Sequence, residues 1–238
     1  MGQGHGWEGA VLKLLRAKDF VFTVTGAEDV TPQYRRVHLK DGGMLAVTGV
    51  HPTMWVRLWF DNAGKPHQRA YTLVDADPEA GTFSLEFALH EGCASDWARA
   101  AQPGDTIEAT VHGTDFAHPD PAPSHVFAIA DTASLPALNS LLGPGLRAGD
   151  GVVRGRAGRP ALPDGRGPAR RTDPAQARRR AHLVTQVKEA LPDLLKGTDE
   201  PYVWIACDTA TTRALTSYVR KELGLPKQRV NALGYWRP

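Results

Sequence analysis

The sequence has little cysteine, no long apolar run and no leader-like start. Cys93 and Cys207 are its only cysteines, too few for a disulfide framework or a four-cysteine zinc site. No run approaches the eighteen consecutive apolar residues of a membrane span, and the first seven residues have neither a basic nor an apolar region. We therefore expect a cytoplasmic protein, with no membrane association and no bound metal.

Acidic and basic residues nearly balance, giving a net charge of +2, but they are unevenly distributed. Residues 143–181 hold ten arginines and three aspartates, which leaves 18 basic and 23 acidic residues elsewhere. A weakly acidic body lacks the basic surface that nucleic-acid binding requires. We expect no nucleic-acid partner, and an RNA-binding function would depend on the arginine-rich segment alone.

The first half of the chain alternates short β-rich runs with turn signals such as Asp41-Gly-Gly43 and Pro103-Gly-Asp105. This spacing predicts a small antiparallel β-barrel. The six expected strands are Phe20–Thr25, Tyr34–Leu39, Thr53–Phe60, Arg69–Val74, Thr82–His90 and Thr106–Val111. The proline-rich stretch Asp115–Pro123 predicts a linker, so we expect one domain over residues 1–122 and a second over 123–238.

The second half has an α/β pattern in which a strand, a loop and a helix follow one another twice. A buried-type strand, Ser124–Ala130, leads into a loop and then a helix that begins near Pro136. A second strand, Tyr202–Ala206, leads through a similar loop into the helix Thr212–Leu223.

The two loops share Asp-Thr-Ala followed by Ser or Thr, which predicts two strand-to-helix turns at one edge of a parallel sheet. Open α/β sheets bind ligands at that edge. The residues that we expect to bind cofactor there are Asp131, Thr132, Ser134, Asp208 and Thr209.

Residues 143–181 use almost only Gly, Pro, Ala, Arg, Asp, Leu and Val, with neither helical nor strand periodicity. They are either a disordered basic insertion or the product of a GC-rich gene read out of frame, and we favour the second interpretation. Helical patterning returns over His182–Leu191.

Arg69-Ala-Tyr71-Thr72 opens a strand, and alternation places Arg69 and Tyr71 on one face. There a guanidinium can bind a pyrophosphate while a phenol ring packs on a flat heterocycle, and Thr72 can meet that heterocycle's polar edge. A dinucleotide flavin needs this combination, although four residues alone also fit an ordinary strand.

The run from His90 to Trp97 supports the flavin interpretation. Gly92, Ala94 and Ser95 let backbone amides approach a phosphate, and Ser95 is expected to cap a short helix whose positive end faces the anion. A plain capped helix with a packed Trp97 is the alternative.

In this order, the motifs resemble those of siderophore-interacting proteins, the FAD-dependent ferric-siderophore reductases. The motifs that carry the resemblance, over about 20–142 and 182–238, are Arg69-x-Tyr-Thr72, His90–Trp97, Pro103-Gly-Asp105, Ala130–Ala137 and Gly234-Tyr-Trp-Arg237. The resemblance implies a ferredoxin-reductase-type FAD-binding β-barrel followed by an α/β parallel-sheet domain that binds a nicotinamide nucleotide. It also implies that Arg69, Tyr71 and Thr72 hold the flavin, with His90, Gly92, Ala94 and Ser95 at its pyrophosphate.

Two departures from the family pattern stand out. His112-Gly-Thr-Asp115 replaces the usual Gly-Pro phosphate loop, and Ala130-Asp131 replaces Gly-Asp. The atypical residues 143–181 stand where the family has the middle of its nucleotide-binding domain. They therefore weaken the expectation of NAD(P)H binding but not that of FAD binding.

Other candidate residues admit two interpretations. Cys207, at a strand end, either lies near a nicotinamide or is a small core residue. Lys227, Arg229 and Arg237 could meet an anionic ferric siderophore or be ordinary surface cations, and Tyr235-Trp236 could cover a flavin face or close the sheet.

The resulting hypothesis is a flavoenzyme in which NAD(P)H reduces FAD and FAD reduces the Fe(III) of a siderophore. We expect ferredoxin as an alternative donor, a monomer, and no catalytic acid, base or nucleophile, since the flavin supplies the chemistry. The alternatives are a flavin reductase of broader ferric or quinone specificity and a flavin-containing siderophore-binding protein without NAD(P)H turnover.

Overall fold

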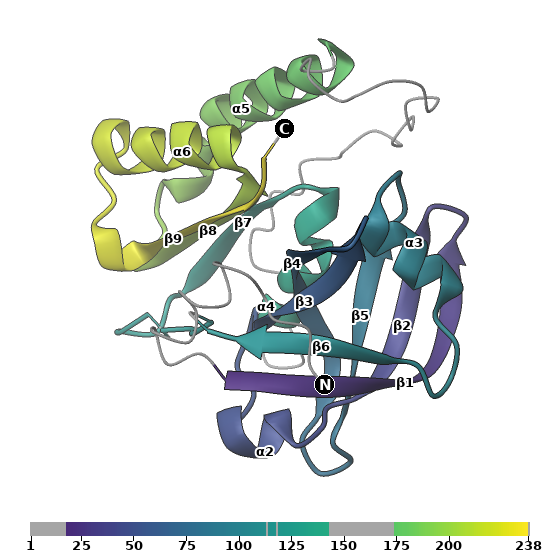
Figure 1. Ribbon diagram of the computed structural model, residues 1–238. Coiled ribbons are helices and arrows are strands. Elements are labelled where there is room, and N and C mark those ends of the chain that lie inside the picture. The colour runs from purple at the N-terminus through teal and green to yellow at the C-terminus, as the bar shows by residue number, and fades with distance from the viewer. Residues whose placement is uncertain (1–17, 113, 118, 143–173, 238) are drawn as a thin grey trace. The chain divides into compact units, whose positions relative to one another are not determined.

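The computed structural model describes residues 18–112, 114–117, 119–142 and 174–237. The chain divides into two compact units, one up to Phe116 and the other from Ala117 onward. Each is described by itself, and the elements of both are labelled in Figure 1.

The first unit is a closed barrel of six antiparallel strands, as the sequence predicts. Its strands are β1 (Lys18–Thr31), β2 (Tyr34–Lys40), β3 (Trp55–Asn62), β4 (Lys65–Asp77), β5 (Thr82–Ala88) and β6 (Thr106–Val111). They pair in the order β1-β2-β5-β4-β3-β6, and the ring closes between β6 and β1. Closure leaves none of these strands as a free edge.

Alternating apolar residues form the barrel because successive side chains of a strand point to opposite faces. Phe22 and Val24 of β1 are buried, as are Val37 and Leu39 of β2. The Phe22 ring meets the Phe83 ring edge to face, with 4.9 Å between their centroids. The inward-facing residues therefore form one apolar core.

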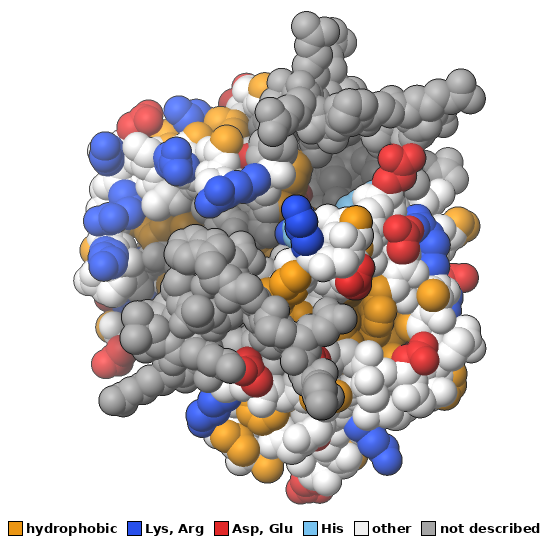
Figure 2. Space-filling view, in the orientation of Figure 1, with side chains coloured by type: hydrophobic (Ala, Val, Ile, Leu, Met, Phe, Trp, Pro, Cys, Tyr) orange, Lys and Arg blue, Asp and Glu red, His pale blue; other side chains and the backbone are white. Residues whose placement is uncertain are grey.

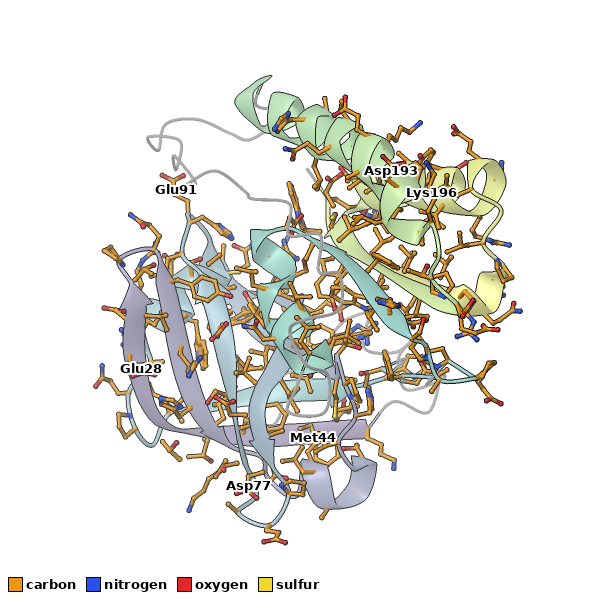
Figure 3. All side chains as sticks on the ribbon, turned by 180° about the vertical axis from the view of Figure 1, so that it is seen from behind. Glu28, Met44, Asp77, Glu91, Asp193 and Lys196 are labelled. Atoms are coloured by element: carbon orange, nitrogen blue, oxygen red, sulfur yellow. The ribbon has the colours of Figure 1, made fainter. Side chains whose placement is uncertain are left out.

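Two short helices lie at opposite ends of the barrel, α2 (Met44–Thr48) and α3 (Cys93–Ala100). Figure 3 shows this through its labels on Met44 and on Glu91, which precedes α3. The sequence pattern does not predict α2. Its start depends on Asp41, whose buried carboxylate accepts bonds from the Gly43 and Leu45 amides at 3.0 and 2.7 Å.

The second unit contains a parallel sheet in the order β7-β8-β9. Its described strands and α-helices are β7 (His125–Ala130), α4 (Leu135–Leu141), α5 (Pro174–Leu195), β8 (Pro201–Asp208), α6 (Thr209–Ser217) and β9 (Val230–Trp236). Residues of α5 and α6, such as Val187 and Leu215, share one apolar core with Ile129 of β7 and Ile205 of β8. This core holds the helices on one face of the sheet.

Both strand-loop-helix units predicted for this half are present, one beginning with β7 and the other with β8. The α5 helix begins at Pro174, eight residues before the expected start at His182, so the end of the arginine-rich segment is helical. Residues 143–173, which include most of that segment, lie outside the described residues. The strand β9 is not among the elements that the sequence predicts. No described helix is both long and apolar enough to span a bilayer.

The turn before α2 contains two glycines, Gly42 and Gly43, that differ in how closely they approach β1. An alanine Cβ at Gly42 would come within 2.3 Å of the Val21 carbonyl oxygen, whereas at Gly43 it would meet nothing within 4 Å. Both glycines have positive φ, so either substitution pays about 1 kcal/mol of backbone strain. We expect Gly42→Ala to cost about 3 kcal/mol or more in unfolding free energy, because a backbone clash is added.

Urea unfolding followed by circular dichroism measures this difference, with Gly43→Ala as the matched control. Equal losses in the two variants would contradict the close approach of Gly42 to β1.

Candidate functional site

Arg69 and Tyr71 lie on one face of β4, as alternation predicts. They stand opposite the buried Leu58 and Val56 of β3. The Arg69 side chain is exposed and its Nη1 donates to the Gln68 carbonyl at 2.9 Å, while Tyr71 packs partly buried on the barrel core. The strand thus presents a cation beside an aromatic ring.

Thr72 lies on the other face of β4. It is buried and stands opposite Trp55 of β3. Its side chain therefore does not share the face of Arg69 and Tyr71, which leaves its backbone as the group beside them.

The α3 helix begins without a side-chain cap. Gly92 precedes its first residue with φ 132°, and within the described part of the chain no side chain accepts a bond from the first-turn amides. A Cβ at Gly92 would meet nothing within 4 Å, so the space there is open. Uncapped amides at a helix N-terminus, together with the helix dipole, favour an anion.

Ser95 is not the expected helix cap. The helix begins at Cys93, so Ser95 is its third residue and is buried. Its hydroxyl oxygen accepts a bond from the His90 amide at 3.1 Å. Ser95 therefore holds the loop before the helix, next to the equally buried Ala94.

Arg99 and the His90 ring stabilise the same loop. Arg99 Nη2 donates to the His90 carbonyl at 3.1 Å, and His90 Nδ1 lies 2.7 Å from the Glu91 carbonyl. These hydrogen bonds, all within residues 90–99, thus hold the loop in place before the start of α3.

Four aromatic rings join β4 to α3. The Tyr71 ring lies 4.3 Å from that of Phe87, which lies 5.7 Å from Trp97, and Phe60 contacts both ends of this row at 6.2 and 5.9 Å. Burial raises the pKa of the Tyr71 hydroxyl; the charge of Arg69 lowers it and that of Cys93, at the start of α3, raises it. The two motifs of the first half therefore pack around one aromatic cluster.

In the second unit, Asp131 and Ser134 organise the turn after β7. The Asp131 carboxylate accepts a bond from the Ala133 amide at 3.0 Å. It thereby caps a 3-10 turn that runs from Thr132 to Ser134. Ser134 is buried and its hydroxyl donates to the Ala206 carbonyl of β8 at 2.5 Å. These bonds tie the turn to the neighbouring strand.

Asp208 has the corresponding role after β8. Its carboxylate accepts bonds from the Ala210 and Thr211 amides at 3.0 and 3.1 Å and so caps α6. The sequence prediction that both turns lie at one edge of the sheet is confirmed, because β7 and β8 are parallel neighbours. Both carboxylates satisfy backbone amides of their own turns.

Trp236, at the end of β9, joins the two turns. Its indole Nε1 donates to Asp131 Oδ2 at 2.8 Å, and its carbonyl accepts a bond from the Thr209 hydroxyl at 3.0 Å. The sequence marks Trp236 as a candidate but does not predict this bond, for which no local pattern exists.

Cys207 is a core residue of the second unit. It is 1% exposed, and its Sγ lies 3.8 Å from the Ile129 carbonyl. Burial raises the pKa of the Cys207 thiol far above its usual value, and the charges of Asp131 and Asp208 raise it further.

Of the three cations suggested for an anionic substrate, Arg229 is unavailable. Its side chain is buried, and its guanidinium donates to the Pro121 carbonyl at 2.8 Å and pairs with Glu200. Lys227 and Arg237 are exposed.

Two family models match the chain. Residues 51–113 match the siderophore-interacting FAD-binding domain, and residues 162–238 match the model described as siderophore-interacting protein. Together they cover more than half of the sequence and confirm the resemblance drawn from the motifs. The second match begins inside the arginine-rich segment.

Curated relatives include two kinds of protein. The mycobactin import ATP-binding/permease protein IrtA of Mycolicibacterium smegmatis is 30% identical over 243 residues, which span 98% of this chain and 27% of that protein. The ferric acinetobactin reductase of Acinetobacter baumannii is 25% identical, over 94% of this chain and 82% of that protein. The chain thus spans about a quarter of the length of the mycobacterial relatives.

Solved structures confirm the expected fold. The siderophore-interacting protein of Acinetobacter baumannii superposes with a TM-score of 0.68 at 22% identity, over 92% of this chain and 91% of that one. A ferredoxin NADP+ reductase of Neisseria gonorrhoeae, with bound FAD and NADP, superposes with a TM-score of 0.63 at 14% identity, over 92% and 99%. The chain therefore has a ferredoxin-reductase-type fold.

The different surroundings of the two cysteines predict different reactivity. Cys93 is partly exposed at the start of α3, whereas Cys207 is buried with a raised pKa. Since the thiolate is the reactive form, we expect iodoacetamide at neutral pH to modify Cys93 at least about tenfold faster than Cys207 in the folded protein.

Peptide mass spectrometry over a time course measures both rates, with the urea-unfolded chain as the control in which they should be similar. Comparable rates in the folded protein would contradict the core position of Cys207.

Proposed function

Because this chain belongs to the siderophore-interacting protein family, we propose that it is an FAD-dependent oxidoreductase that passes electrons from NAD(P)H to a ferric siderophore. The observation that carries the proposal is the single site formed by Arg69, Tyr71 and the uncapped start of α3. The match of residues 51–113 to the FAD-binding domain model supports FAD as the cofactor. The relative that is named a ferric acinetobactin reductase supports the substrate class.

The first-unit site has the groups that a flavin dinucleotide needs. The exposed guanidinium of Arg69 suits a pyrophosphate, which it can bind through two parallel hydrogen bonds. The open space before α3 gives the same anion access to backbone amides, and Gly92 admits it because it has no side chain. The Tyr71 ring, held by Phe87, gives an aromatic surface for the flat heterocycle.

We assign the remaining flavin contacts by position. Backbone groups of Thr72 suit the polar edge of the heterocycle, since its side chain lies on the other face of β4. His90, Ala94 and Ser95 shape the pyrophosphate loop, whose amides Ser95 helps to orient.

In the second unit we place the nicotinamide donor at the carboxyl edge of the sheet. This is the edge at which open α/β sheets bind nucleotides. The turns there consist of Asp131, Thr132, Ser134, Asp208 and Thr209. The neighbour with bound FAD and NADP supports such a donor, and the ferredoxin reductases of the same fold support ferredoxin as an alternative.

Positive charge on the second unit suits anionic molecules. Arg213, Arg220, Lys221 and Lys227 are exposed, and Figure 2 shows Lys and Arg side chains gathered on one face of this unit. Such a field raises the local concentration of anions such as nicotinamide nucleotides.

Bound FAD would convert a two-electron donor into a source of single electrons for Fe(III). The protein's part is to bind and orient, so no protein acid, base or nucleophile is required. The hard oxygen ligands of a siderophore suit Fe(III), and reduction to the softer Fe(II) weakens the chelate. We propose that the chain acts as a monomer in the cytoplasm, a reducing compartment that suits its two free cysteines.

Anaerobic absorbance spectroscopy of the full chain loaded with FAD tests the proposal. Bleaching of the flavin by NADPH or NADH, followed by recolouring and Fe(II) release on adding a ferric siderophore, is the expected result. A chain that binds no FAD would overturn the proposal. Bound flavin that neither nucleotide bleaches would leave the siderophore-binding alternative or a ferredoxin donor.

Arg69→Ala tests the flavin site itself. Loss of a charge-assisted bond to pyrophosphate should weaken FAD binding about tenfold to a hundredfold. Quenching of flavin fluorescence during titration measures the dissociation constant.

Lys65→Ala, which removes another exposed cation of β4, is the matched control and should leave FAD affinity within about twofold, as an exposed charge outside the site contributes little. Equal affinities of Arg69→Ala and the wild type would remove Arg69 from the site.

A further inference from the structure

The last residues of β9 depart from regular pairing with β8. Cys207 stands opposite Gly234, but the next pair joins Asp208 to Trp236, so Tyr235 is an extra residue in β9. Such bulges rotate the residues that follow and redirect their side chains. Here the bulge brings Trp236, rather than Tyr235, next to the end of β8.

The Trp236 side chain then reaches past β8. The strand order is β7-β8-β9, and yet the indole of β9 donates to Asp131, which follows β7. The ring therefore lies across the carboxyl end of the middle strand. This is the edge at which open α/β sheets bind nucleotides.

The backbone of Trp236 is held from the other side. The Thr209 hydroxyl donates to the Trp236 carbonyl at 3.0 Å. A Cβ at Gly234 would lie 3.0 Å from Thr209 Oγ1 and 3.1 Å from Thr209 Cα, so β9 approaches α6 more closely than a residue with a side chain would fit without a shift. Both ends of the tryptophan are thus fixed, its backbone by Thr209 and its ring by Asp131.

Both carboxylate oxygens of Asp131 already have donors within the protein. Oδ1 accepts the Ala133 amide at 3.0 Å and the Ser134 hydroxyl at 3.4 Å, and Oδ2 accepts the Trp236 indole at 2.8 Å. Burial raises the pKa of the Asp131 carboxyl, whereas the bond from Trp236 lowers it. A carboxylate whose oxygens are held by protein donors repels the phosphates of a nucleotide and gives them no hydrogen-bond donor.

We propose that Asp131 is a positioning residue for the nicotinamide donor, which it affects only by holding the Trp236 indole across the end of β8. The inference rests on the proposed function, since it assumes that the donor binds at this edge. It replaces direct contact between the Asp131 carboxylate and the donor with an action through the ring. Asp208 does not share this role, because its carboxylate caps α6.

A double-mutant cycle on the FAD-loaded full chain separates the two kinds of action. Trp236→Phe keeps a ring but removes the donor group, and Asp131→Asn can satisfy only one of the two donors that now share the carboxylate. Isothermal titration with NADP+ and, in parallel, NAD+ gives the dissociation constant of a nucleotide that does not react. We expect each single variant to weaken binding about tenfold and the double variant to weaken it by about the same factor. A residue in direct contact with the nucleotide would instead give nearly multiplicative losses, about a hundredfold.

Nuclear magnetic resonance of the indole groups provides a readout without any nucleotide. The chain has six tryptophans, so the indole signal that disappears in Trp236→Phe belongs to Trp236. That signal should shift in Asp131→Asn. The control is Asp193→Asn at the exposed end of α5, where Asp193 pairs with Lys196 (Figure 3), and it should leave the signal unchanged.

The outcomes distinguish this inference from the proposed function. Any of three results would overturn the role of Asp131 alone. Both single variants could bind the nucleotide as tightly as the wild type does, or the losses of the two variants could multiply. The third such result is an indole signal that does not shift in Asp131→Asn. A wild type that binds neither NADP+ nor NAD+ would overturn the proposed donor, and the role of Asp131 with it.

Discussion

The packing of four aromatic rings between β4 and α3 is the contact on which the first-unit site depends. Arg69 and Tyr71 are strand residues, whereas the uncapped amides belong to a helix about twenty positions later. Phe87 and Trp97 fill the space between them, and aromatic pairs add about 0.5–1.5 kcal/mol each beyond their buried area. The closed barrel fixes the register of β4, since a slip by one residue would turn Tyr71 away from these rings.

The sites of the two units differ in whether a side chain caps the start of the helix beside them. In the first, Gly92 leaves the start of α3 without a side-chain acceptor, so an external anion can take that place. In the second, Asp208 caps α6 and Asp131 caps the turn after β7, so their carboxylates already satisfy the amides. The start of α3 thus leaves amides for a phosphate, while the described sheet edge of the second unit offers a tryptophan ring held by partly buried hydrogen bonds.

The elements with clear periodicity could be predicted, and those set by distant contacts could not. All six barrel strands follow short β-rich runs bounded by turn signals, and both strand-to-helix turns follow from their composition. The α2 helix was missed because five residues carry too little periodicity and its start depends on the buried Asp41. Ser95 was misplaced as a cap because the helix begins two residues earlier, after the positive φ of Gly92. Arg229 gave no local sign that it pairs with Glu200.

The sequence by itself determined the two kinds of unit, the family resemblance and the residue types proposed for the flavin site, because alternation, turn composition and motif order are read directly from the sequence. Only the tertiary structure decided that Tyr71 and the start of α3 share one site, that Cys207 is a core thiol, and that Trp236 bonds to Asp131 across an intervening strand. Each of these depends on strand order, register and a bulge, which bring together residues that are distant in sequence.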